Sequence, residues 1–332
     1  MDIPEPGVKV KRVVIVGAGF AGLTLARKLS GQRIQVVLVD KNNYHQFQPL
    51  LYQVATAGLE PSSISFPLRK VFQDQKNIFI RVAEVKKVVP EKNEIETSIG
   101  VIPYDYLVLA NGAESNFFGN ENLSHYGYSM KSVSEALLIR NTLLQNYEHA
   151  LVTNNESDRL ALLNIVIVGG GPTGVELAGA IAEMKNKLLP KDYPELNFTS
   201  MKIYLLEAAS GLINSMSTAS AVRVNSYLEA LGVEVLTGTA VEDYDGETVY
   251  LSDQCTLKTR CLIWAAGVKG AAIEGIPPSA VLANNRISVD SYNRIAGTEN
   301  VFALGDLACM MTGKQPKGHP QVAPVAMQQA AL

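Results

Sequence analysis

LLNIVIVGGGPTGVELAG, residues 162–179, joins an apolar run to a glycine cluster and then to the start of a helical pattern. The same arrangement occurs earlier, in RVVIVGAGFAGLTLARKL at residues 12–29. Each β-branched run that ends in glycine predicts a buried parallel strand, and a helix follows it. The glycines have the G-x-G-x-x-G spacing of a strand–turn–helix unit that binds a dinucleotide. A chain with two such units is expected to bind two dinucleotides.

The strands that follow each glycine cluster occur in the same order. In the first half, a buried strand ends in Asp40 and a later apolar strand ends in Gly112. In the second half, the corresponding strands end in Glu207 and Gly267. This matching order indicates an internal duplication of one nucleotide-binding unit.

Shorter elements complete the predicted pattern. A helix is expected over 132–151, with Ser132 or Ser134 as its N-cap, and TNNESD at 153–158 is expected to be a polar loop. Each half also predicts a small antiparallel β layer. Its strands are expected within 77–85, 86–89 and 94–99 in the first half, and within 232–244 and 247–253 in the second.

The predicted fold class is therefore α/β, with two Rossmann-like dinucleotide-binding domains and a small antiparallel β layer in each. The second domain is expected to be inserted in the first. The first domain would comprise residues 1–115 and 270–332, and the second residues 116–269.

The residue types in the glycine turns have separate physical roles. Gly17 permits the tight turn, Gly19 lets the backbone approach a pyrophosphate, and Gly22 lets the helix pack closely on the strand. The helix N-terminus supplies unpaired N–H groups for the phosphates. Asp40 ends the next strand, where a carboxylate accepts hydrogen bonds from ribose hydroxyls.

The second unit predicts a preference between nicotinamide cofactors. Gly169, Gly171 and Gly174 repeat the glycine pattern, and Glu207 is the acid. A carboxylate there favours a free 2′-hydroxyl and repels a 2′-phosphate, so NADH is expected over NADPH. Arg223 lies downstream and would complicate this preference, but it is interpreted as a solvated helix residue.

Composition excludes several other classes. The chain has 332 residues, 47% of them hydrophobic, and a net charge of −3 with no basic block, which argues against a nucleic-acid partner. Its three cysteines form no C-x-x-C pair and its four histidines have no metal-ligand spacing, so no metal site is expected. No run of the sequence reaches the roughly 18–20 apolar residues of a membrane span.

Two neighbouring dinucleotides suggest electron transfer, for which a reduced nicotinamide and a flavin are the usual pair. The stretch NVFALGDLA, which begins at Asn300, predicts a strand that returns to the first unit and ends at Gly305 and Asp306. There Asp306 would place a carboxylate on the ribityl chain of a flavin.

These motifs together resemble the two-dinucleotide-binding-domain flavoproteins related to the pyridine nucleotide-disulfide reductases. GAGFAG with Asp40, ANG at 110–112, GGGPTG, WAAG at 264–267 and LGD at 304–306 match that superfamily's pattern in order over essentially the whole chain. The resemblance implies FAD on the first unit and NAD(P)H on the second.

Within that superfamily the chain resembles the type II NADH dehydrogenases, which are non-electrogenic NADH:quinone oxidoreductases. The redox-active cysteine pair of disulfide reductases is missing from residues 41–64, which excludes thiol relay chemistry. The stretches FQPLLYQVATAGLEPSSIS, GGGPTGVELAGAIAE and PQVAPVAMQQA carry the closer resemblance. It implies that hydride passes from NADH to FAD and that two electrons then pass to a membrane quinone, without proton pumping.

The resemblance also implies the site residues. Glu176 would lie near the nicotinamide and flavin N5, and Gln328 would contact quinone or flavin, although Pro324 replaces the first glutamine of the family's A-Q-x-A-x-Q motif. The FAD site would comprise Gly17, Gly19, Phe20, Ala21, Gly22, Asp40, Lys41, Tyr52, Gln53, Val85, Ala110, Gly112, Gly305 and Asp306. The NADH site would comprise Gly169, Gly171, Pro172, Thr173, Gly174, Glu207, Ala266 and Gly267.

Other expectations concern partners and location. The chain stops at MQQAAL, and a C-terminal membrane-anchoring module of the family is expected to be absent from it. A full-length form would be peripheral on the cytoplasmic side of the cell membrane, at its inner face, and a homodimer is possible; the 332-residue chain without that module would be soluble. The alternatives are a soluble NADH diaphorase or ferredoxin-reductase-like enzyme, and a redox-sensing flavoprotein of the apoptosis-inducing-factor type.

Overall fold

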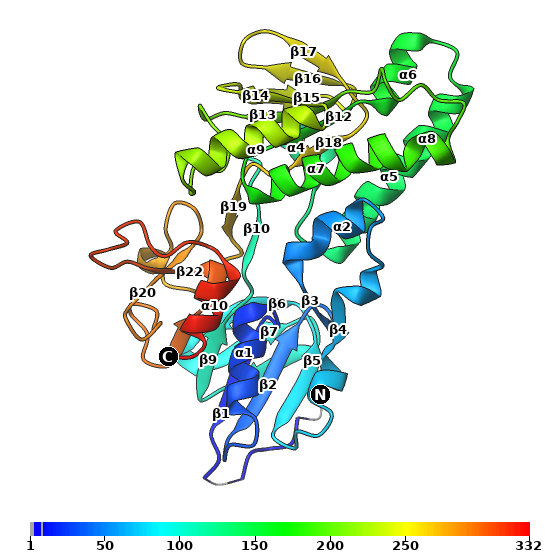
Figure 1. The fold of residues 1–332 in the computed structure, drawn as a ribbon. Coiled ribbons are helices and arrows are strands. Elements are labelled where there is room, and N and C mark those ends of the chain that lie inside the picture. The colour runs from blue at the N-terminus through cyan, green and yellow to red at the C-terminus, as the bar shows by residue number, and fades with distance from the viewer. Residues whose placement is uncertain (1–2, 8) are drawn as a thin grey trace. The chain divides into compact units, whose positions relative to one another are not determined.

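A computed structural model describes residues 3–7 and 9–332 of the chain. The chain forms two compact units (Figure 1). The first comprises Met1–Gln46, Ser65–Glu114 and Val268–Leu332, and the second comprises Phe47–Ile64 and Ser115–Gly267.

The first unit is built on a five-stranded parallel sheet. Its strand order is β21-β9-β1-β2-β5. The strands are β1 (Arg12–Val16), β2 (Gln35–Asp40), β5 (Ile78–Val82), β9 (Tyr106–Leu109) and β21 (Val301–Ala303). The central strands are apolar on both faces because both faces are covered, as is usual for parallel sheets.

The two faces of this sheet are covered by different layers. Side chains alternate along β1, so Val14 and Val16 pack in one core cluster while Val13 and Ile15 pack in another. The first cluster includes residues of an antiparallel layer formed by β6 (Val85–Val89), β7 (Glu94–Thr97) and β8 (Gly100–Pro103). The second includes residues of α1 (Phe20–Leu29), α3 (Leu68–Val71) and α10 (Ala323–Gln329), and Figure 1 shows α10 beside α1.

The remaining strands of the first unit form short ribbons. β3 (Tyr44–Gln46) pairs with β4 (Ser65–Pro67). β20 (Ile287–Val289) pairs in parallel with β22 (Ala308–Met310). β10 (Ala113–Ser115) pairs with β19 (Val268–Gly270), and there the Lys269 ammonium lies 3.2 Å from the Glu114 carboxylate.

The second unit repeats the plan. Its parallel sheet has the order β11-β18-β12-β13-β14. The strands are β11 (Tyr128–Ser129), β12 (Ile165–Val168), β13 (Ile203–Glu207), β14 (Val233–Thr237) and β18 (Leu262–Trp264). One face is covered by an antiparallel layer of β15 (Val241–Tyr244), β16 (Thr248–Leu251) and β17 (Thr256–Lys258). Figure 1 shows α7 (Pro172–Lys187) and α9 (Thr218–Ala230) on the other side of this sheet.

Further helices belong to the second unit. α5 (Val133–Val152) begins after Ser132, whose hydroxyl accepts the Glu135 N–H, which confirms one of the two predicted caps. α2 (Leu51–Ala55) packs on α5 and α7. The others are α4 (Glu121–Tyr126), α6 (Glu156–Leu163) and α8 (Leu189–Asp192). The described residues of the two units also contain five short 3-10 turns: Gln48–Leu50, Pro61–Ser63, Pro90–Lys92, Pro278–Ala280 and Gly305–Leu307.

The predicted fold class is confirmed, because two parallel α/β units are present and each has a small antiparallel layer. Three local predictions were wrong. Ile78–Val82 and Val233–Thr237 are edge strands of the parallel sheets, not strands of the antiparallel layers, because a half-buried alternating run does not specify its partner. The predicted loop 153–158 already contains the first turn of α6, whose N-terminus is capped by the side chain of Asn155.

The segment Phe47–Ile64 clusters with the second unit, whereas the sequence-based boundary of 1–115 placed it in the first. Its helix α2 packs on α5 and α7. The sequence of a short amphipathic segment indicates which of its faces is apolar. It does not indicate which other element will cover that face.

A glycine-to-alanine substitution is expected to change the stability of the protein in opposite directions at two positions of α7. A Cβ at Gly174 would lie closer than 3.0 Å to the Gly169 carbonyl oxygen, which belongs to backbone, so Gly174→Ala should destabilise the protein by about 3 kcal/mol. A Cβ at Gly179 meets only Leu228 at 3.9 Å, so Gly179→Ala should stabilise it by roughly 0.5–1 kcal/mol through helix propensity.

Urea unfolding of both variants beside the unsubstituted protein measures the two changes. Equal and small effects at both positions would contradict the close helix–turn contact.

Candidate functional site

The first glycine turn lies at the carboxyl end of β1. Gly17 adopts a φ of +95°, and its N–H donates to the Val39 carbonyl at 2.7 Å. On the other side, the Ala110 N–H donates to the Val16 carbonyl at 2.7 Å. A Cβ at Gly22 would lie closer than 3.0 Å to the Gly17 carbonyl oxygen. The first turn of α1 therefore rests directly on the backbone of the glycine turn.

Asp40 fixes this turn from the end of β2. One carboxylate oxygen accepts the Ala18 N–H at 2.7 Å, and the other accepts the Asn42 N–H at 2.7 Å. Burial raises the pKa of the Asp40 carboxyl, and these two hydrogen bonds only partly oppose that rise. Each oxygen retains a lone pair that can accept a ribose hydroxyl.

His45 is a member of this site that the sequence did not reveal. Its Nδ1 lies 2.8 Å from the Ala18 carbonyl oxygen, and its buried ring packs edge-on against Phe20 at 5.4 Å between centroids. It lies on β3, which no glycine or charge pattern marks, so a lone histidine at that position carried no signal.

The N-terminus of α1 leaves room for a phosphate group. Gly19 is its N-cap and makes no side-chain capping bond, and the first turn holds no acid. A Cβ at Gly19 would meet nothing within 4 Å. Unpaired helix N–H groups that face open space are suited to an anion, so the residues present fit a dinucleotide pyrophosphate.

The second glycine turn makes hydrogen bonds equivalent to those of the first. Gly169 has a φ of +114°, and its N–H donates to the Leu206 carbonyl at 2.8 Å. Glu207 accepts the Gly170 N–H at 2.6 Å and the Ala209 N–H at 2.8 Å. Gly171 caps α7 and, like Gly19, has nothing within 4 Å of an added Cβ. This unit therefore also fits a dinucleotide.

A third turn completes the site of the first unit. It follows β21, where Gly305 adopts a φ of +70°. The Gly305 N–H donates to Oε1 of Gln329 at 2.8 Å, and Nε2 of Gln321 donates to the Asp306 carbonyl at 2.9 Å. Within the part of the chain that the structure describes, the carboxylate of Asp306 has no hydrogen-bond partner, so it is available to a ligand.

The predicted residues fall into both units. In the first unit, those at the glycine turns gather at the carboxyl ends of β1, β2, β9 and β21, where ligands bind in open α/β sheets. Tyr52 and Gln53 lie instead on α2 of the second unit, where Nε2 of Gln53 donates to the Tyr52 hydroxyl at 3.1 Å. The remaining predicted FAD-site residues lie in the first unit: Phe20, Ala21, Lys41, Val85 and Gly112. The remaining predicted NADH-site residues lie in the second unit: Pro172, Thr173, Ala266 and Gly267.

Two predicted side chains face solvent. Gln328 is exposed on α10, whereas its neighbour Gln329 is buried against the Gly305 turn. Glu176, in the second turn of α7, is exposed, yet neighbouring protein atoms remove enough water to raise the pKa of its carboxyl. Among the described residues, that carboxyl has no hydrogen-bond or ion-pair partner.

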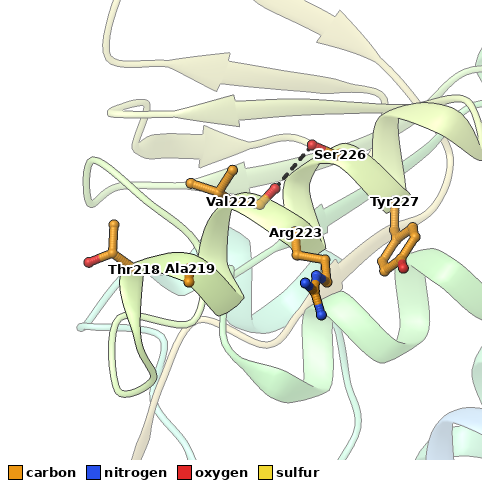
Figure 2. A pocket seen from close by; sticks show the side chains of 6 residues that line it. All are labelled: Thr218, Ala219, Val222, Arg223, Ser226 and Tyr227. Atoms are coloured by element: carbon orange, nitrogen blue, oxygen red, sulfur yellow. Dashed lines mark hydrogen bonds between the residues drawn. The ribbon is translucent and has the colours of Figure 1, made fainter.

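A separate shallow hollow of about 510 Å³ lies along α9. Figure 2 shows that all its lining residues come from that one helix. Arg223 lies there, beside Ser226, whose hydroxyl donates to the Val222 carbonyl at 3.1 Å. The hollow includes none of the predicted dinucleotide-binding residues. Its lining comprises Thr218, Ala219, Val222, Arg223, Ser226 and Tyr227.

The class of protein follows from the duplicated site and from one family comparison. Residues 11–330 match the family model described as pyridine nucleotide-disulphide oxidoreductase. The chain belongs to this family, whose members are flavin oxidoreductases that use FAD with a nicotinamide nucleotide. No helix among the described residues is long and apolar enough to span a membrane.

Individual relatives narrow the class. The type II NADH:quinone oxidoreductase Ndh of Mycobacterium tuberculosis is 33% identical over 96% of this chain and 70% of its own length. The corresponding protein of Staphylococcus aureus is 27% identical over 96% of this chain and 80% of its own. The external alternative NAD(P)H-ubiquinone oxidoreductase B2 of Arabidopsis thaliana is 28% identical over 92% of this chain and 56% of its own.

A solved structure agrees with the fold. NDH2 from Plasmodium falciparum in complex with NADH aligns with a TM-score of 0.89 and 22% identity, over 97% of this chain and 82% of that one. Within its family, the chain therefore groups with the type II NADH:quinone oxidoreductases. It spans between 56% and 80% of the length of the curated relatives named above.

Proposed function

We propose that this chain passes hydride from NADH to a bound FAD and two electrons onward to a quinone, without pumping protons. The observation that carries the proposal is the duplicated turn, in which Asp40 and Glu207 each accept two backbone N–H groups beside an open helix N-terminus. When bound, FAD supplies a group that accepts a hydride and then reduces a second substrate.

The first unit would hold FAD. The α1 N-terminus and Gly19 would receive the pyrophosphate, and Asp40 would accept a ribose hydroxyl. The Asp306 carboxylate, which has no partner among the described residues, would accept from the ribityl chain. These residues bind and orient the cofactor, and orientation at near-attack distance supplies much of the rate in hydride transfer.

The second unit would hold NADH. Gly171 and the N-terminus of α7 would receive its pyrophosphate, and the Glu207 carboxylate would accept from the 2′-hydroxyl. A 2′-phosphate would meet the negative charge of Glu207 and be disfavoured.

Anaerobic mixing with NADH in a stopped-flow instrument tests the whole proposal. NADH should bleach the visible flavin bands quickly, NADPH at least about tenfold more slowly, and a short-tailed quinone should restore the bands. Glu207→Gln keeps one of the two acceptor oxygens but loses the charge, so it should reduce the rate advantage of NADH over NADPH. Glu183→Gln, at an exposed position of α7 in the same unit, is the control and should leave that advantage unchanged.

Each outcome of that experiment separates the candidates. Bleaching by NADH without reoxidation by quinone would favour a diaphorase or ferredoxin-reductase-like enzyme. Very slow bleaching with a long-lived NAD–flavin complex would favour a redox-sensing flavoprotein. Absence of bleaching in FAD-loaded protein would refute hydride transfer.

Glu176 is proposed to exchange protons near the reacting rings. Its pKa is raised by loss of water around the carboxyl, so it holds its proton to a higher pH than an ordinary glutamate. If it donates that proton during quinone reduction, the reoxidation rate should fall as pH rises through the raised pKa. Glu176→Gln should remove that inflection from the rate–pH curve, and an unchanged curve would exclude the role.

Gln328 is proposed to contact quinone, since its amide is exposed on α10 and matches the last glutamine of the family motif. Gln328→Leu should raise the KM for quinone by about tenfold, the loss of roughly one hydrogen bond, and leave flavin reduction by NADH unchanged. A quinone KM within twofold of the unsubstituted protein would show that Gln328 is a surface residue.

A membrane face is also proposed, because the substrate quinones of this class reside in membranes, and a homodimer is a separate proposal. Analytical ultracentrifugation tests the homodimer, and a monomer would contradict it. Co-sedimentation with anionic lipid vesicles tests the membrane face, and protein that stays in the supernatant would show that the described residues alone provide no such face.

A further inference from the structure

The Gly305–Asp306 turn is clamped by two glutamine side chains that flank and end α10. Gln329 accepts the Gly305 N–H through Oε1 at 2.8 Å, and Gln321 donates through Nε2 to the Asp306 carbonyl at 2.9 Å. One glutamine therefore holds the backbone before the Asp306 side chain and the other holds the backbone after it.

Gln329 is itself fixed on its backbone side. Its carbonyl accepts from Nδ2 of Asn293 at 3.3 Å, and Asn293 is 3% exposed with a φ of +62°. The Asn293 carbonyl in turn accepts the Ala303 N–H at 3.0 Å, at the end of β21. The side chain of Gln329 thus closes a ring of bonds between β21, the Gly305 turn and α10.

The turn needs this support for a steric reason. Gly305 has a left-handed φ of +70° and is buried, with Ala21 of α1 and Ala326 of α10 each 3.3–3.4 Å from the place of its missing Cβ. Because Gly305 is buried and its N–H can only donate, that N–H requires an acceptor. Gln329 supplies an uncharged oxygen, which does not repel the nearby Asp306 carboxylate.

We propose that Gln329 is the positioning residue of the flavin site, which holds Asp306 in the orientation that binds the FAD ribityl chain. This inference rests on the proposed function, because it assumes FAD in the first unit. Gln329 touches neither cofactor nor substrate and acts only through the Gly305 turn. The adjacent Gln328 points to solvent and does not share the role.

FAD release from the holoenzyme tests the inference, followed as the rise in flavin fluorescence after dilution. Gln329→Met has a similar shape but no strong acceptor, so FAD should dissociate about tenfold faster, as expected for an unpaired buried N–H. Gln329→Asn retains a neutral amide acceptor on a side chain one methylene shorter and should release FAD more slowly than Gln329→Met. Met327→Ala, at an exposed position of the same helix, is the matched control and should change nothing.

The outcomes are distinct from those of the proposed function. If the unsubstituted protein holds no FAD, the proposed function fails. If it holds FAD and Gln329→Met releases it at the unsubstituted rate, only the role of Gln329 fails. Equal acceleration in Gln329→Met and Gln329→Asn, with matching losses of thermal stability, would show a purely structural residue and overturn the inference.

Discussion

In both units a helix packs backbone to backbone on the glycine turn that precedes it, and the ligand sites of both sheets follow from that contact. Gly22 rests on Gly17 in the first unit, and Gly174 rests on Gly169 in the second. Because no Cβ separates them, each helix begins directly beside the end of a central strand. Its unpaired N–H groups then face the carboxyl edge of the sheet, where ligands of parallel α/β sheets bind.

The two acids hold this arrangement in equivalent ways. Asp40 bonds to Ala18 and Asn42, and Glu207 bonds to Gly170 and Ala209, so each carboxylate bridges its own strand end and the glycine turn. Such an acid is part of the turn before any cofactor arrives. Burial disfavours the charged form of such an acid, and the pKa of Asp40 is raised for that reason. The same burial holds the carboxylate in place as an acceptor for a ribose hydroxyl.

Much of the fold was predictable because the decisive signals are local. A buried strand that ends in glycine, a helix after it and an acid at the next strand end all lie within about forty residues. The edge strands β5 and β14 were misassigned because a short alternating run is compatible with either sheet type. The placement of Phe47–Ile64 with the second unit also escaped prediction, since it depends on the partners of α2.

The duplicated α/β plan, the two glycine turns and the acids that accompany them could all be predicted from the residues alone. These features follow from steric rules within one strand–turn–helix unit, and such rules are readable from residue spacing. Two contacts depend on how distant segments pack: His45 packs against the first glycine turn, and Gln329, not Gln328, accepts the Gly305 N–H. Neighbouring residues of a helix point about 100° apart. Which of the two glutamines reaches the Gly305 turn, 24 residues from Gln329, therefore depends on how the helix packs.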